Sequence, residues 1–278
     1  MVILLCNEEI LGIDKLAVFR SGVRVIDDIS LTIYCGEFVG IVGPNGAGKT
    51  TLLLTILGIL KPKTGAIKIY DKLPTDKSIV GKVGWVPQTA SKLPTNVHIT
   101  VREFIQLGTL SRKSWFQIRK QEREKVDKII EIVGLTDYAN KKITHLSGGQ
   151  RQRAAIGKAL ASDADLILMD EPMVGVDRES RNSIMKLLDG LCHNENKTIV
   201  MISHDLSSIK RTVHRMIYLE ETIRYDGPTE TFPDLSKLAE LRGIEPTHDD
   251  GQIYDAESIN NDSNTIILVP GKGGEKNA

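Results

Sequence analysis

Gly43-Pro44-Asn45-Gly46-Ala47-Gly48-Lys49-Thr50 fits the pattern G-x-x-x-x-G-K-[ST], in which a glycine-rich loop wraps phosphate groups. A short apolar run at 37–42 precedes this stretch, and residues 50–60 follow it with helical spacing. The stretch therefore lies between a strand and a helix, which is the context that the pattern requires. Backbone N–H groups and the positive end of the helix dipole favour an anion. We expect a triphosphate here, with Lys49 on its outer phosphates and Thr50 on Mg²⁺.

Two carboxylates form the second candidate element of the site. Asp170 and Glu171 follow directly after the apolar run Leu166–Met169, which reads as a buried strand. Open α/β sheets bind their ligands at the carboxyl ends of the strands. Phosphoryl transfer depends mainly on positioning and charge control. We expect Asp170 to support Mg²⁺ through its water shell and Glu171 to orient and polarise the attacking water.

The third element is Leu146-Ser147-Gly148-Gly149-Gln150, which precedes a helical run that extends to Leu160. Two glycines and a serine ahead of a helix N-terminus form another anion-binding end. The loop at 43–50 is already expected to bind one nucleotide. A second phosphate-binding segment in the same chain therefore indicates that residues 146–150 contact the ATP of another subunit.

With these three elements the chain closely resembles the ATP-binding-cassette (ABC) ATPases, from Lys15 to about Glu230. The resemblance includes Gln88 in the segment 86–88, Asp177 after Val176, and His204 in the segment 202–205. It implies that Gln88 senses Mg²⁺ and the γ-phosphate while linking to a transmembrane partner. It also implies that His204 contacts the γ-phosphate. Phe19 is the ring available to stack on adenine, with a place in the core of a strand as the alternative.

The resemblance assigns the candidate site residues as three groups. Those expected in hydrolysis are Lys49, Gln88, Glu171 and His204, and those expected near Mg²⁺ are Thr50, Gln88 and Asp170. Those expected at ATP are Phe19, Gly43, Pro44, Asn45, Gly46, Ala47, Gly48, Lys49, Thr50, Thr51, Ser147, Gly148, Gly149, Gln150 and Asp177. Two copies are expected to pack head to tail with twofold symmetry, so that residues 43–51 of one and 147–150 of the other enclose each ATP.

The fold class implied is α/β, a P-loop NTPase core of the ABC ATPase type with an N-terminal antiparallel β subdomain and an inserted helical subdomain. The ATP-binding domain is expected over 1–230, with the helical subdomain at about 89–160, and a partly mobile C-terminal extension over 231–278. Periodicity predicts strands at 15–19, 29–34, 67–70, 82–86, 164–169, 198–202 and 265–269. It predicts further helices at 101–108, 111–133 and 178–191.

Composition excludes several classes of protein. Lys plus Arg equals Asp plus Glu at 36 each, so the chain has no net positive charge that would attract nucleic acid. No nucleic-acid partner is expected. The longest near-apolar run, 52–60, is shorter than the ~20 residues of a membrane span. The first six residues have no basic segment and no small-residue cleavage site, so no secretory signal is expected.

The cysteines and histidines do not predict a metal site. The three cysteines are odd in number and far apart, which argues against a disulfide framework and a zinc cluster: Cys6, Cys35 and Cys192. Five of the histidines show no spacing suited to a metal ion: His98, His145, His193, His214 and His248.

Two segments resemble those of the ATPases of zinc, manganese and iron importers: Gly175-Val176-Asp177, and residues 99–104, which open the helical region. The resemblance implies an ATPase at the cytoplasmic face of the membrane that energises uptake of a divalent metal. It implies a separate permease and an extracytoplasmic solute-binding protein as partners. The alternatives are an importer of another small solute, such as a siderophore or cobalamin, or a non-transport cassette acting on ribosomes or DNA. One cassette and no long heptad insertion disfavour the last.

Overall fold

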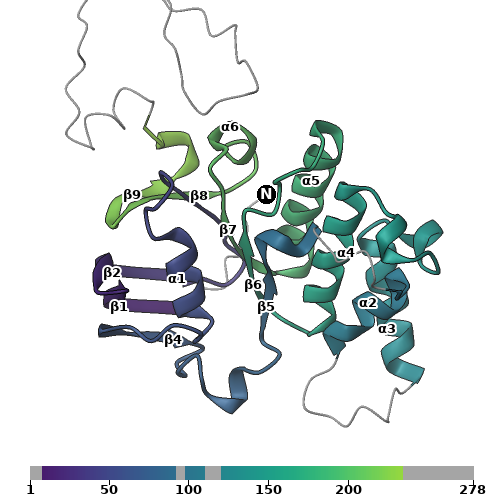
Figure 1. Cartoon of the computed structure of the whole chain (residues 1–278), viewed down its shortest axis with the longest axis horizontal. Helices are drawn as coiled ribbons and strands as arrows, with labels where there is room; N and C mark the ends of the chain where they lie inside the picture. The colour runs from purple at the N-terminus through teal and green to yellow at the C-terminus, as the bar shows by residue number, and fades with distance from the viewer. Residues whose placement is uncertain (1–7, 92–97, 110–119, 234–278) are drawn as a thin grey trace, which may run out of the picture. The chain divides into compact units, whose positions relative to one another are not determined.

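A computed structural model describes residues 8–91, 98–109 and 120–233 (Figure 1). Residues up to Phe232 belong to one compact unit, and a second unit begins at Pro233. The predicted strand at 265–269 and almost all of the predicted C-terminal extension lie outside the described residues, as do positions 111–119 of a predicted helix. The fold class is confirmed as α/β with two sheets and an inserted group of helices.

A six-stranded sheet carries the core, in the order β5-β6-β7-β3-β8-β9. Its strands are β3 (Phe38–Val42), β5 (Val83–Val86), β6 (Leu166–Asp170), β7 (Thr198–Ile202), β8 (Arg215–Glu220) and β9 (Thr222–Pro228). The first five strands in this order are parallel, and β9 pairs antiparallel with β8 at the edge. Every residue of β3, β6 and β7 is buried, which explains why these strands read as continuous apolar runs.

A three-stranded antiparallel sheet in the order β2-β1-β4 forms the predicted N-terminal subdomain. Its strands are β1 (Glu9–Arg20), β2 (Val23–Tyr34) and β4 (Thr64–Ile69). β1 and β2 are longer than the predicted strands, and their pairing is interrupted by register shifts. Lys15 and Asp28 have positive φ of 44° and 47° at these irregularities. Such bulges break the strict alternation that marks a strand in sequence.

Each helix of the core follows a strand of the large sheet. α1 (Lys49–Ile56) follows β3, α5 (Arg178–Glu195) joins β6 to β7, and α6 (Leu206–Ile209) follows β7. α5 begins where Asp177 accepts a hydrogen bond from the backbone N–H of Ser180, and it ends at Asn196 in the left-handed region. α1 is shorter than the predicted helix because the chain turns at Gly58, with φ of 71°.

The inserted helical subdomain lies between β5 and β6 along the chain. It contains α2 (Val101–Gln106), α3 (Lys120–Ile132) and α4 (Gly148–Ala161), which contact one another. α2 and α4 each begin with a capping box, formed by Thr100 and Glu103 in α2 and by Ser147 and Gln150 in α4. The three helices gather on one side of the large sheet in Figure 1, beyond β5 and β6.

Two further features differ from the sequence-based prediction. The β8–β9 hairpin was not predicted, although β8 contributes four buried residues to the core. The histidine pattern was predicted to hold no metal-site geometry, yet the side chains of His193 on α5 and His214 beside β8 come together with Asp189. Their proximity depends on the packing of α5 beside β8, which residue spacing does not reveal.

No helix in the described ranges combines the length and the apolar composition needed to cross a bilayer.

We expect Leu168→Ala, at a fully buried position in β6, to lower the free energy of unfolding by about 2–5 kcal/mol, because it leaves a cavity in a close-packed sheet. Urea unfolding of the nucleotide-free chain measures the change. Ile59→Ala is the control, since Ile59 is 57% exposed and its loss should alter stability by less than about 0.5 kcal/mol. Equal effects of the two substitutions would contradict the placement of β6 in the core.

Candidate nucleotide site

Four strand ends meet at one edge of the large sheet. β5, β6, β7 and β3 are parallel neighbours, so their carboxyl ends point the same way. The glycine-rich loop follows β3, Asp170 ends β6 and is followed by Glu171, His204 comes shortly after β7, and Gln88 comes shortly after β5. Segments far apart in the sequence thus deliver the predicted hydrolytic residues to one place.

Close backbone approach explains two glycines of the loop, Gly43 and Gly48. A Cβ at Gly43, which has φ of 154°, would lie 2.0 Å from the carbonyl oxygen of Leu219 on β8. A Cβ at Gly48, with φ of 91°, would lie 2.8 Å from the carbonyl oxygen of Val25 on β2. The backbones of the large sheet and of the three-stranded sheet therefore both lie in close contact with the loop. Asn45 and Gly46 are exposed at its tip, whereas Ala47 and Thr51 are buried beneath it.

Lys49 is held under the loop with 7% of its surface exposed. Its Nζ donates hydrogen bonds to the carbonyl oxygens of Gly43 at 2.8 Å and Pro44 at 2.7 Å. Burial lowers the pKa of Lys49, and the nearby carboxylates of Glu171 and Asp170 act in the opposite direction. An ammonium group carries three protons, so one more acceptor, such as a phosphate oxygen, suits this geometry.

Thr50 and Asp170 form a polar pair suited to a hard cation. The Thr50 hydroxyl donates to Oδ1 of Asp170 at 3.2 Å, across the strand β7 that separates β3 from β6. Burial raises the pKa of Asp170, while the hydrogen bond from Thr50 and the charge of Lys49 oppose that shift. Hydroxyl and carboxylate oxygens are the ligands that Mg²⁺ prefers, so these residues fit a magnesium ion.

Glu171 lies between the residues that follow β5 and β7. Gln88 Nε2 donates to Glu171 Oε2 at 2.9 Å, and His204 Nδ1 lies 3.3 Å from Glu171 Oε1. The backbone of Glu171 has a positive φ of 45°, which is uncommon for a residue with a side chain and typical of functional sites. The backbone N–H of Glu171 donates to the carbonyl oxygen of Ile202 at 3.1 Å, which anchors this turn to β7.

A cavity of about 200 Å³ adjoins Glu171 and His204, and its lining includes an ion pair that was not predicted. Arg181 on α5 donates from its guanidinium to Asp205 Oδ2 at 2.6 Å. This ion pair connects the first turn of α5 to the segment that carries His204. The position of Asp205 directly after His204 was the available sequence signal, whereas Arg181 sits on an ordinary amphipathic helix and gave none.

Residues 147–150, which are the N-cap and first turn of α4, form a second cluster with the segment around Asp177. The Ser147 Oγ accepts the backbone N–H of Gln150 at 3.2 Å, and the Gln150 side chain accepts the backbone N–H of Ser147 at 3.0 Å. A Cβ at Gly149 would lie 2.6 Å from the Ser180 side chain, so this first turn packs closely on the start of α5. The predicted ATP contacts thus divide into two groups, each with its own hydrogen bonds.

Phe19 lies near the turn of the β1–β2 hairpin and is 43% exposed. It pairs with Arg24, whose guanidinium carbon lies 5.8 Å from the ring centroid. The alternative of a core strand residue is therefore wrong for Phe19. Stacking on adenine stays a prediction, and the exposed face of the ring is compatible with it.

Comparisons with known proteins agree on one family. The ABC transporter family model matches residues 26–174. The high-affinity zinc uptake system ATP-binding protein ZnuC of Bacillus subtilis is 38% identical, over 72% of this chain and 86% of that protein. A probable metal transport system ATP-binding protein of Chlamydia pneumoniae is 36% identical, over 77% of this chain and 86% of that protein. A dimeric structure of a bacterial ABC transporter cassette is 29% identical with a TM-score of 0.68, covering 80% of this chain and 100% of that one.

We expect Gly43→Ala to weaken ATP binding and destabilise the chain more than Gly46→Ala does. Both positions have positive φ, but a Cβ at Gly46 meets nothing within 4 Å, whereas one at Gly43 meets the Leu219 carbonyl. Gly46→Ala should cost about 1–2 kcal/mol of backbone strain alone. Thermal unfolding and titration with a fluorescent ATP analogue measure the two effects. Equal losses for both variants would mean that the contact with β8 is unimportant.

Asp170→Asn should stabilise the nucleotide-free chain at neutral pH while weakening Mg²⁺-dependent ATP binding. Burial raises the pKa of Asp170, so the folded chain holds this proton more tightly than the unfolded chain does. The wild type therefore loses stability relative to the Asn variant as the pH rises from ~3.9, the ordinary value, through the raised pKa. Unfolding free energies across this range test the sign. A wild type that is more stable than Asp170→Asn at pH 7 would refute this explanation.

Proposed function

The chain belongs to the ABC transporter family of ATP-binding proteins, and we propose that it is the ATPase subunit of an importer that takes up manganese, zinc or iron. The observation that carries the ATPase assignment is the position of Glu171 between Gln88 and His204, at the sheet edge that holds Lys49 and Asp170. The metal assignment is supported by the relatives that are named for zinc and metal transport and align over 86% of their own length.

In this proposal every side chain of the edge has a role in binding or hydrolysis, and Gln88 and His204 each have more than one. The ammonium group of Lys49 donates a hydrogen bond to the outer phosphate oxygens of ATP and gives up part of its hydrogen bonding to the carbonyl oxygens of Gly43 and Pro44. Thr50, Asp170 and Gln88 hold Mg²⁺, which when bound neutralises charge on the phosphates. Glu171 accepts a proton from water and aims the water oxygen at the γ-phosphate, while Gln88 and His204 fix its two carboxylate oxygens. His204 also reaches the γ-phosphate once it is present.

A second copy of the chain completes the site. Ser147 and its neighbours cap α4 and pack on the Asp177 segment, which leaves the N-terminal end of α4 to attract an anion from outside the chain. The dimeric cassette structure with 29% identity supports a pair of copies as the working form, which we propose to be packed head to tail. ATP then lies between the glycine-rich loop of one copy and Ser147–Gln150 of the other, and hydrolysis releases the pair.

The partners follow from the importer assignment. The pair of ATPase chains closes and opens, and this motion is transmitted to a membrane permease. Gln88 links the permease to the nucleotide. An extracytoplasmic solute-binding protein delivers the metal. The chain then works at the cytoplasmic face of the membrane. The equal numbers of acidic and basic residues support a protein partner over nucleic acid.

We expect Glu171→Gln to lower the ATP hydrolysis rate by about 10²–10⁴-fold, because the amide cannot accept the proton of water. ATP affinity should stay within a few fold of the wild type, since Lys49 and the loop are unchanged. Phosphate release and nucleotide titration measure the two quantities. Glu131→Gln, at an exposed position on α3, is the matched control and should keep the wild-type rate.

Uptake of zinc, manganese and iron in the native host tests the transport assignment. Replacing the wild-type chain by Glu171→Gln at matched expression should abolish uptake of one of these metals and leave the Glu131→Gln strain unaffected. Unchanged uptake of all three metals would remove the metal importer proposal. A loss confined to another solute, such as a siderophore or cobalamin, would replace the cargo while keeping the importer class.

A further inference from the structure

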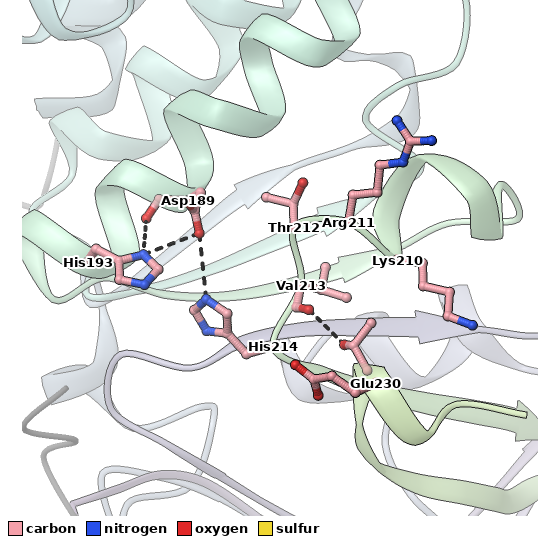
Figure 2. A pocket seen from close by; sticks show the side chains of 9 residues that line it. Asp189, His193, Lys210, Arg211, Thr212, Val213, His214 and Glu230 are labelled. Atoms are coloured by element: carbon pink, nitrogen blue, oxygen red, sulfur yellow. Dashed lines mark hydrogen bonds and ion pairs between the residues drawn. The ribbon is translucent and has the colours of Figure 1, made fainter. Parts of the chain in front are cut away.

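Three potential metal ligands from two parts of the chain meet near the C-terminal end of α5 (Figure 2). Asp189 and His193 lie one turn apart on α5, and His214 lies immediately before β8. Asp189 Oδ1 is 3.2 Å from His193 Nδ1 and 3.6 Å from His214 Nε2. One ligand atom from each residue lies within 4.8 Å of the other two.

These distances suit a small tetrahedral ion. Ligand atoms bound ~2.0–2.1 Å from a tetrahedral Zn²⁺ lie ~3.3 Å from one another, close to both distances measured from Asp189. Residues four apart on a helix share one face, as in the zinc sites that take two ligands from one helix. Two imidazoles and a carboxylate with a fourth position left to water form a common zinc ligand set, whereas Mg²⁺ prefers oxygen ligands.

The backbone fixes the two elements that carry the ligands. The backbone N–H of His214 donates to the carbonyl oxygen of Phe38 on β3 at 2.9 Å, and its carbonyl oxygen accepts the N–H of Thr229 at 3.1 Å. The imidazole of His214 packs edge-on against both Phe38 and the imidazole of His193, with centroid distances of 6.3 and 5.0 Å. His214 is therefore positioned by the large sheet, and Asp189 and His193 are positioned by the helix α5.

The surroundings admit a cation from solvent. The three side chains are 33–41% exposed, and they border a cavity of about 540 Å³. Lys210 and Arg211 also line this cavity, but Figure 2 shows both pointing away from the imidazoles. The ammonium of Lys210 lies 5.9 Å from the ring centroid of Phe232. His193 is in the last turn of α5, where the negative end of the helix dipole favours a positive ion.

We propose that Asp189, His193 and His214 bind one divalent transition-metal ion of the Zn²⁺ class, at a site separate from the nucleotide site. The ion joins the C-terminal part of α5 to the start of β8, since it takes ligands from both. This assignment does not depend on the identity of the transported solute, because it rests on the chemistry and placement of the three side chains.

Titration of the full-length, chelator-treated chain with Zn²⁺ alone, without nucleotide, tests the proposal. Calorimetry should give one saturable site that excess Mg²⁺ does not occupy, and Zn²⁺ should raise the melting temperature. His214→Ala and His193→Ala should each weaken this binding by more than the ~10–100-fold typical of losing an outer partner of a ligand. His98→Ala, at an exposed position away from the trio, should bind like the wild type.

Asp189→Asn provides a second test that preserves shape and hydrogen bonding, in case an alanine variant folds poorly. Its ATP affinity should equal that of the wild type while its Zn²⁺ affinity falls. With Co²⁺ as the probe, the intense visible absorption of a tetrahedral site should appear in the wild type and be lost in His214→Ala. Zn²⁺ binding that is unchanged in His214→Ala and Asp189→Asn, or the absence of a saturable site in the wild type, would overturn the proposal.

Discussion

Parallel pairing of β3, β5, β6 and β7 is the constraint on which the nucleotide site depends. It places the glycine-rich loop, the acidic pair, Gln88 and His204 at one edge, although they are spread over much of the chain. The ammonium of Lys49 and the carboxylate of Asp170 are both partly removed from water there, so each is destabilised as an isolated charge and stabilised by opposite charges. A bound phosphate would stabilise the positive charge of Lys49, and a bound cation would stabilise the negative charge of Asp170.

The parts of the site with a local sequence signal could be predicted. The loop 43–50, the run before Asp170 and the glycines before α4 are each contiguous, and each must begin or end a regular element. What needed the structure depends on contacts between distant segments. The positive φ of Glu171, the Arg181–Asp205 ion pair and the meeting of His193 with His214 all arise from packing around α5 and β7. The long strands β1 and β2 were underestimated because bulges near Lys15 and Asp28 interrupt their alternation.

α5 connects the two sites proposed for this chain. Its N-cap is Asp177, in the segment that packs on residues 147–150 at the start of α4. Its last turns carry Asp189 and His193. A helix of 18 residues is about 27 Å long, so the two ends are well separated but belong to one rigid element. An ion bound between α5 and the start of β8 would therefore act on the same helix that begins at Asp177, next to residues 147–150.

We propose that one chain holds only half of each ATP site. Sedimentation velocity of the Glu171→Gln chain, with and without ATP and Mg²⁺, measures whether nucleotide joins two copies. We expect a monomer without nucleotide, a dimer with ATP, and no dimer when Lys49→Ala or Ser147→Arg is added. A chain that remains monomeric in saturating ATP, or a dimer that still forms with Lys49→Ala or Ser147→Arg, would contradict this division of the ATP site.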